Sequence, residues 1–311
     1  MIAVAGEALI DLVVGTGGQV SAHPGGGPYN AARTLARLGL PVTFLGRLAA
    51  DGFGRLLRER LTAEGVTLGL PGPSGRPSTL AVAAVDPAGV ADYSFYLDGT
   101  AAADVTFEVL RAALPDAVTA VHVGTLGLVM EPVGAAVERL VRTAVPAGAL
   151  VFLDPNCRPT AVSGAGAYRG RISAIAQRAD IVKASVEDLA YLYPGLPPEA
   201  AAKALLAAGT PLVLVTDGPH PARAFFSGTV LTGEVPSVTV ADTIGAGDAF
   251  GGGFLGWWTA RGLGRADLRR AELVEPALRA AAGVAALTCA RPGADPPVLA
   301  EVTNRGWWPA T

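Results

Sequence analysis

The sequence predicts an α/β fold in which a mostly parallel sheet is flanked by helices and accompanied by a small β-lid. Half of the 311 residues are hydrophobic and only 16% are charged, so burial can offset the conformational entropy lost on folding. Short β-branched segments alternate with helical patterns along most of the chain, and a hairpin interrupts this alternation near residue 80. We expect one domain over residues 1–311.

Most predicted strands are followed by a helical pattern, which is typical of a parallel sheet with helices on both faces. The predicted pairs are residues 42–46 with 51–64, 118–124 with 131–144, 149–153 with 168–179, and 181–183 with 185–193 and 199–208, before a further strand at 212–215. A second hairpin, residues 222–227 and 230–234, precedes a mainly helical last third.

The interruption is a predicted β-hairpin of residues 79–85 and 90–96 around the turn-forming residues 86–89. With the first strand and the glycine-rich turn at 15–18, it is expected to form a small separate sheet, a lid built from about residues 11–22 and 79–97. Its apolar face, Leu80, Val82 and Ala84, needs a covering surface because a hairpin cannot bury it alone. A cleft below the lid, or the lid of a second copy in a homodimer, would supply that surface.

The composition argues against several classes of protein. A net charge of -3 gives no electrostatic basis for binding nucleic acid. Cys157 and Cys289 form no C-x-x-C pair, so neither a disulfide framework nor a thiolate zinc site is indicated. No basic region precedes the apolar start of the chain, and its apolar stretches are shorter than the ~20 residues that span a bilayer. We expect a cytoplasmic protein without a membrane or nucleic-acid partner.

The segment DTIGAGDAF, residues 242–250, runs from a predicted loop into a predicted helix. Small residues at Gly245, Ala246 and Gly247 leave the backbone N–H groups uncovered, and the helix N-terminus adds partial positive charge. This combination predicts a site that binds an anion such as phosphate. Alternatively, Asp248 simply stabilises the start of the helix, and the spacing does not decide between the two interpretations.

A second glycine-rich segment, GGGPYN at residues 25–30, also leads into a predicted helix. Bare backbone at Gly26 and Gly27 would let a ligand approach closely, and the Asn30 side chain can both donate and accept hydrogen bonds. The alternative is an ordinary loop and helix cap. Asp11, in the segment GEALID, is by itself an acidic residue at the end of a strand.

These two segments carry a resemblance to a known family. Residues 242–248 resemble the D-T-x-G-A-G-D signature of the ribokinase-like (PfkB) carbohydrate kinases, and residues 25–39 resemble its other signature. The resemblance implies a ribokinase-like fold and ATP-dependent phosphorylation of a sugar hydroxyl. It implies that Asp248 is the base, that the amides of Gly245, Ala246 and Gly247 hold the transferring phosphoryl group, and that the sugar contacts are Asp11, Gly26, Gly27 and Asn30.

Two further segments indicate the sugar. The D-P-N-x-R segment at 154–158 resembles fructokinase-like members and implies sugar contacts by Asn156 and Arg158, although a simple turn is an equal alternative. Residues 95–104 resemble a bacterial fructokinase segment and imply a contact by Tyr96. Leu97 stands where kinases of 2-keto-3-deoxygluconate often carry an arginine, which favours a neutral sugar such as fructose. Ribokinase and nucleoside-kinase activities remain alternatives.

The resemblance also places the nucleotide and its ions. It implies that ATP lies near Lys183, Thr216, Gly218, Ala286 and Cys289. Glu187 is expected to contact Mg²⁺ through water, with Ser185 as a substitute for the family's asparagine or only a helix cap. The loop after Cys289 could help Asp242 and Thr243 bind a monovalent cation such as K⁺.

Other nucleotide-binding motifs lack the sequence context that they require. Neither lysine follows glycine as a P-loop requires, and the G-x-G-x-x-G match at 251–256 lies inside a predicted helix, where close helix packing explains the glycines. The alternative from another class is a sugar-binding regulator without catalysis. The intact D-T-x-G-A-G-D segment speaks against it, because a binding module needs no base.

Overall fold

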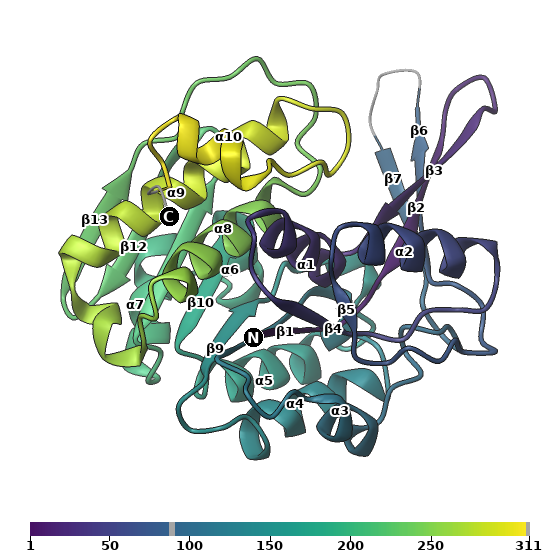
Figure 1. Cartoon of the computed structure of the whole chain (residues 1–311), viewed down its shortest axis with the longest axis horizontal. Helices are drawn as coiled ribbons and strands as arrows, with labels where there is room; N and C mark the ends of the chain where they lie inside the picture. Colours follow the sequence, from purple (N-terminus) through teal and green to yellow (C-terminus); the bar gives the residue numbers. More distant parts are fainter. Residues whose placement is uncertain (87–90, 309–311) are drawn as a thin grey trace.

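The computed structural model describes residues 1–86 and 91–308, whose strands form two sheets (Figure 1). The larger sheet has the order β13-β12-β11-β10-β9-β8-β1-β4-β5 and is parallel from β11 to β5, with β12 and β13 antiparallel. Its strands are β1 (Ile2–Ala5), β4 (Val42–Leu45), β5 (Thr67–Leu68), β8 (Ala120–Gly124), β9 (Leu150–Asp154), β10 (Ile181–Ser185), β11 (Leu212–Asp217), β12 (His220–Phe226) and β13 (Thr229–Gly233).

Helices cover both faces of this sheet, and successive residues of each buried strand enter opposite cores. In β1, Ile2 and Val4 pack toward α1, α2, α8 and α9, whereas Ala3 and Ala5 pack toward the layer of α3 to α7. The helices are α1 (Gly27–Arg37), α2 (Gly52–Ala63), α3 (Phe107–Ala113), α4 (Val133–Thr143), α5 (Ala165–Ala176), α6 (Val186–Leu192), α7 (Pro198–Ala207), α8 (Ala246–Ala260), α9 (Ala271–Cys289) and α10 (Leu299–Asn304).

The smaller sheet stands beside the larger one and has the order β3-β2-β6-β7 (Figure 1). Its strands are β2 (Leu9–Val14), β3 (Val20–Gly25), β6 (Leu80–Val85) and β7 (Ala91–Tyr96). The two arms predicted around residue 85 therefore do form a hairpin, β6 with β7. Of the predicted turn at residues 86–89, residues 87–89 lie outside the described part of the chain.

The first predicted strand is divided between the two sheets. β1 lies inside the large sheet between β4 and β8, and only β2 joins the small sheet. The break falls at Gly6, which has φ 148° and lies so close to Pro28 that a side chain would collide with it. The first strand of the chain, β1, is thus not part of the small sheet as expected, whereas the expected lid segment at about residues 11–22 does belong to β2, β3 and the turn between them. An apolar run alone does not show where the chain passes from one sheet to the other.

The long helices α8 and α9 pack closely against each other. A Cβ added at Gly253 would lie 3.1 Å from Val284 Cβ on α9, and one at Gly252 would lie 2.9 Å from Thr34 Cβ on α1. Among the three glycines of the G-x-G-x-x-G match, Gly253 faces α9, Gly251 lies against Phe152 on β9, and Gly256 lies against Leu40 and Trp308. Close packing of α8 therefore explains these glycines, as predicted. None of the described helices is both long enough and apolar enough to cross a membrane.

Candidate active site

Asp248 lies in the first turn of α8 and is 7% exposed. Two amide side chains from distant parts of the chain hold its carboxylate. Asn30 Nδ2, on α1, donates to Asp248 Oδ2 at 2.9 Å, and Asn156 Nδ2, after β9, donates to Oδ1 at 3.2 Å. Burial, with a smaller contribution from Asp154, raises the pKa of Asp248 to about 7. This oriented carboxylate can therefore take up a proton near neutral pH.

The turn that begins α8 presents backbone groups. Gly245 is the N-cap residue in the left-handed region, with φ 76°, and a side chain there would lie 2.6 Å from Ala294 Cβ. A Cβ at Gly247 would lie 2.9 Å from Lys183 Nζ. Lys183 is buried and forms an ion pair with Asp154 at 2.9 Å. A helix N-terminus with an ammonium group beside it is suited to bind an anion.

On the other side of Asp248 lies the start of α1. Gly26, its N-cap residue, has φ 108°. A side chain at Gly27 would collide with Thr125 and would lie 3.2 Å from Asp248 Oδ1. Glycine at these positions therefore lets the backbone of the loop border the Asp248 carboxylate directly, and a small ligand could approach from this side.

Asp11 on β2 and Arg158 after β9 extend this polar lining. Burial raises the pKa of Asp11 to about 6, although the positive charge of Arg158 opposes the rise. Arg158 Nη1 donates to Asn156 Oδ1 at 2.7 Å. One guanidinium thus acts electrostatically on Asp11 and holds the amide that in turn holds Asp248.

Tyr96 does not share the face of the small sheet that carries Asp11. The register pairs Tyr96 with Leu80 and Phe95 with Ala81, and Ala81 pairs in turn with Asp11. Since paired residues point to the same face, Phe95 lies on the Asp11 face, whereas Tyr96 lies on the opposite face and is 59% exposed. In this register Phe95, and not Tyr96, is the aromatic residue on the same side as Asp11, while the substrate contact of Tyr96 stays a prediction.

Besides Lys183 on β10, the residues expected at the nucleotide come from the end of β11, the turn after it and α9. Thr216 is half-buried near the end of β11, and Gly218 lies in the following turn with φ 53°. Cys289 ends α9, and its carbonyl oxygen accepts a hydrogen bond from the Asp242 amide at 3.2 Å. Ala286 is 3% exposed and packs inside the protein, and its contact with the nucleotide stays a prediction.

Asp242 joins the loop before α8 to the loop after α9. Its Oδ1 accepts a hydrogen bond from the Ile244 amide at 3.0 Å, and its Oδ2 accepts one from the Gly293 amide at 2.9 Å. Thr243 is exposed beside it, and its carbonyl oxygen accepts from the Ala246 amide at 3.3 Å. The two segments expected near a monovalent cation therefore lie together.

Glu187 and its neighbours occupy the start of α6. Glu187 is exposed, whereas the next residue, Asp188, is buried. Asp188 forms a capping box with Ser185 and accepts a hydrogen bond from the Cys157 amide at 2.6 Å. Ser185 is thus a helix cap, which was one of its two interpretations. Within residues 1–86 and 91–308, no group of three or more His, Cys, Asp or Glu side chains could hold a metal ion.

Two further residues of the site, Glu7 and Thr125, are not predicted by the sequence. Glu7 is fully buried between β1 and β2, and its carboxylate accepts hydrogen bonds from the Gly27 amide at 3.1 Å and the Gly127 amide at 2.7 Å. Burial raises the pKa of Glu7 to about 8. Thr125 has φ 59° and lies against Gly27. An acid inside an apolar segment was the available signal for Glu7, but its partners lie 20 and 120 residues away.

A buried, oriented carboxylate beside the start of a helix that is suited to bind an anion is the arrangement that phosphoryl transfer needs. The sequence pattern of the pfkB family carbohydrate kinases matches residues 1–301, and the chain belongs to this family. It is an ATP-dependent carbohydrate kinase, as the sequence predicted.

Individual relatives are similar over most of their length. The chain is 36% identical over 264 residues to the fructokinase of Rhizobium leguminosarum bv. trifolii, covering 82% of this chain and 78% of that protein. The structure of fructokinase with bound ATP from Xylella fastidiosa has a TM-score of 0.86 and 29% identity over 97% of each chain. A fructokinase double mutant from Vibrio cholerae O395, solved in fructose, ADP and potassium ion bound form, has a TM-score of 0.85 and 25% identity over 97% of each chain.

Proposed function

We propose that this kinase is a fructokinase that transfers the γ-phosphoryl group of ATP to a terminal hydroxyl of fructose. The observation that carries the reaction is the Asp248 carboxylate, which Asn30 and Asn156 orient in the first turn of α8. Fructose is favoured because the relatives described above are fructokinases, one of them solved with fructose and ADP.

In the proposed reaction, Asp248 accepts the proton of the sugar hydroxyl while the hydroxyl oxygen attacks the γ-phosphorus of ATP. A new P–O bond to the sugar forms, the bond to the β-phosphate oxygen breaks, and ADP leaves with the electron pair. The amides of Gly245, Ala246 and Gly247 would stabilise the charge on the transferring group, and Lys183 would add a buried positive charge beside them.

The lid side would orient the sugar. Asp11 and Arg158 offer hydrogen-bonding groups to its hydroxyls, and Gly26 and Gly27 allow close approach to the backbone. Phe95, on the Asp11 face of the small sheet, would cover an apolar face of the sugar. Closure of the small sheet over the cleft would exclude water and limit wasteful hydrolysis of ATP.

A neutral sugar is favoured over a sugar acid. Leu97 is 9% exposed and belongs to the same apolar cluster as Leu9 and Ala81, so its position supplies no cation for a carboxylate. Arg158 is exposed and acts electrostatically on Asp11, so 2-keto-3-deoxygluconate could pair with it and is the second candidate. Ribose and nucleosides are further alternatives, because small changes in a sugar pocket decide among them.

Two ions belong to the proposal. Glu187 would hold Mg²⁺ through water; an exposed carboxylate suits an ion whose other ligands are nucleotide phosphates and water. Bound Mg²⁺ would neutralise charge on the phosphates. Asp242, Thr243 and the loop after Cys289 would hold K⁺, supported by the contact of these two loops. We place the activity in the cytoplasm, where thiols stay reduced.

ADP release from magnesium ATP, measured with fructose, 2-keto-3-deoxygluconate, ribose and adenosine, tests the proposal. Fructose should give the highest kcat/KM, and K⁺ should raise the rate above that in its absence. A tenfold preference for 2-keto-3-deoxygluconate would overturn the sugar assignment. Stoichiometric binding of a sugar without sugar-dependent ADP release would instead support a regulator that only binds sugar.

A further inference from the structure

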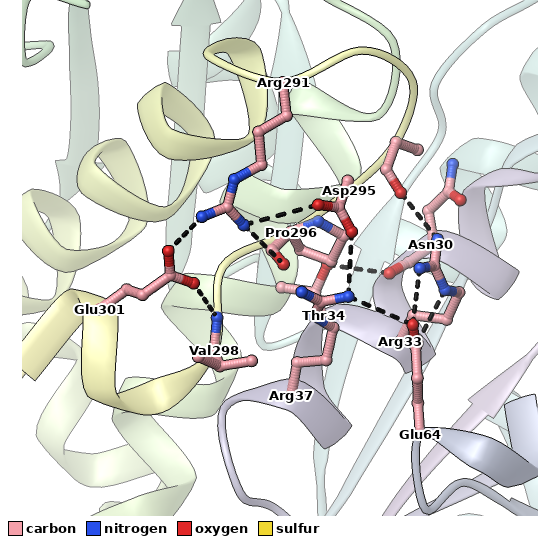
Figure 2. Close-up of polar contacts among 11 residues, drawn as sticks. Asn30, Arg33, Thr34, Arg37, Glu64, Arg291, Asp295, Pro296, Val298 and Glu301 are labelled. Atoms are coloured by element: carbon pink, nitrogen blue, oxygen red, sulfur yellow. Dashed lines mark hydrogen bonds and ion pairs between the residues drawn. The ribbon is translucent and has the colours of Figure 1, made fainter. Parts of the chain in front are cut away.

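Arg33 lies on α1, one turn after Asn30, and is 2% exposed. Figure 2 shows its guanidinium beside the Glu64 carboxylate. Nε and Nη2 donate to the Glu64 carboxylate at 2.8 and 2.7 Å, and Nη1 donates to the Ala294 carbonyl oxygen at 2.7 Å. Because the guanidinium is planar and rigid, the bidentate pair with Glu64 fixes the direction of the third donor.

Ala294 belongs to the loop of residues 290–297, which connects α9 with α10 and borders the start of α8. A Cβ at Gly245 would lie 3.2 Å from Ala294 Cα, so the loop packs directly on the turn that begins α8. One residue earlier, the Gly293 amide donates to Asp242 Oδ2. The loop therefore touches the phosphate-binding turn on one side and receives the Arg33 guanidinium on the other.

Neighbouring ion pairs hold the same loop. Arg37, one turn after Arg33 on α1, contacts Asp295 at 2.9 Å and Glu64 at 3.3 Å. Arg291 contacts Asp295 at 3.6 Å and pairs with Glu301 on α10 (Figure 2). These pairs are more exposed than Arg33, whose side chain is 3% exposed, so solvent screens them more strongly.

We propose that Arg33 is a positioning residue that sets the 290–297 loop, and through it the turn at 242–247, relative to α1. α1 carries Asn30, which orients the base Asp248, and the turn carries the amides that would hold the phosphoryl group. The Arg33 contacts thus keep Asn30, which sets the direction of the Asp248 carboxylate, in register with the turn that carries the amides, and this inference rests on the proposed function. A misplacement of about 1 Å in such a site can cost roughly 100-fold in rate.

The first variant is Arg33→Met, which keeps an unbranched apolar side chain and removes all the donors. We expect kcat to fall at least tenfold, at a temperature where the variant is folded, and the KM for fructose to change less than threefold. Amide hydrogen exchange should become faster in residues 242–247 and 290–297 without a matching increase in the strands of the large sheet. Arg55→Met, on the exposed face of α2, is the matched control and should leave all three measurements unchanged.

The double variant Arg33→Met with Glu64→Met distinguishes the positioning role from a purely structural role of Arg33. The single variant leaves the Glu64 carboxylate without its main partner, whereas the double variant leaves no such unpaired charge and should recover much of the melting temperature. A positioning role requires that kcat stays low and local exchange stays fast in this more stable protein. Recovery of kcat together with the melting temperature would overturn the proposal.

The two proposals fail in different ways. If the unmodified protein releases no ADP in response to any sugar, the proposed function fails, while hydrogen exchange at 242–247 still tests the link through Arg33. If the unmodified protein is active but folded Arg33→Met has the same kcat and the same exchange at 242–247, the positioning role is refuted and the proposed function stands.

Discussion

Asp248 combines burial with two amide donors, and each half of this arrangement has a separate consequence. Asn30 and Asn156 fix where the carboxylate points, and burial raises its affinity for a proton. Asp248→Asn keeps the size of the side chain but cannot accept a proton. We expect kcat to fall by roughly 10²–10⁴-fold, with little change in sugar or ATP affinity, in steady-state and binding measurements. Turnover within threefold of the parent would remove Asp248 from the mechanism.

The raised pKa of Asp248 also links pH to activity and stability. The base must be ionised, so kcat/KM should decline as pH falls below about 7. The folded carboxyl binds its proton more tightly than the unfolded one, whose pKa is near 3.8, so its stabilising contribution is complete below that value and is lost as pH rises through 7. Asp248→Asn removes this titration, and its melting temperature relative to the parent should increase between pH 5 and pH 8. A difference that stays constant over this range would contradict the shift.

At the scale of elements, Asp51 ties helix α2 to the small sheet. As the N-cap residue of α2 it accepts a hydrogen bond from the Gly54 amide at 2.8 Å, and it also accepts from the Ser78 amide and hydroxyl, just before β6, at 2.8 and 2.7 Å. Asp51→Ala should lower the free energy of unfolding by about 1–2 kcal/mol, measured by urea denaturation. Thr106→Ala is the control, because Thr106 caps α3 without a side-chain hydrogen bond. Equal losses in the two variants would refute the role of Asp51.

At the scale of the whole molecule, the outer face of the small sheet indicates how two copies would meet. This face carries Leu80, Val82 and Ala84 of β6, which pair with Tyr96, Ser94 and Asp92 of β7. Tyr96 is 59% exposed, and Val20, at the start of β3, is 62% exposed. We propose that the same face of a second copy covers these apolar side chains in a homodimer.

Light scattering at micromolar concentration should give the mass of a dimer for the parent protein. Val82→Asp should convert the protein to a monomer, because a carboxylate would be buried without a partner at the centre of the face. Val230→Asp, an equivalent change on β13 of the large sheet, should leave the dimer intact. A monomeric parent, or a dimer that persists in Val82→Asp, would exclude this interface.

Local patterns in the sequence determined the α/β class, both hairpins and the glycine-rich start of α8, because periodicity and turn residues act over a few neighbouring positions. The DTIGAGD segment was sufficient to place Asp248 at the start of a helix and to identify the family. The sequence did not determine that the chain passes from the large sheet to the small sheet at Gly6. It also did not determine which face of β7 lies toward the site. Those depend on register, and a shift of one residue exchanges Tyr96 for Phe95.

Only the tertiary structure decided which side chains act together. Asn30 and Asp248 are 218 residues apart, and Arg33 reaches Ala294 across 261 residues. Glu7 accepts hydrogen bonds from amides in two separate segments, at Gly27 and Gly127, and in isolation it is only an acid inside an apolar segment. No local pattern encodes such pairs, since each depends on how helices α1, α8 and α9 pack on one face of the large sheet. The sequence determines the groups that do the chemistry, and packing determines their partners and therefore their pKa and direction.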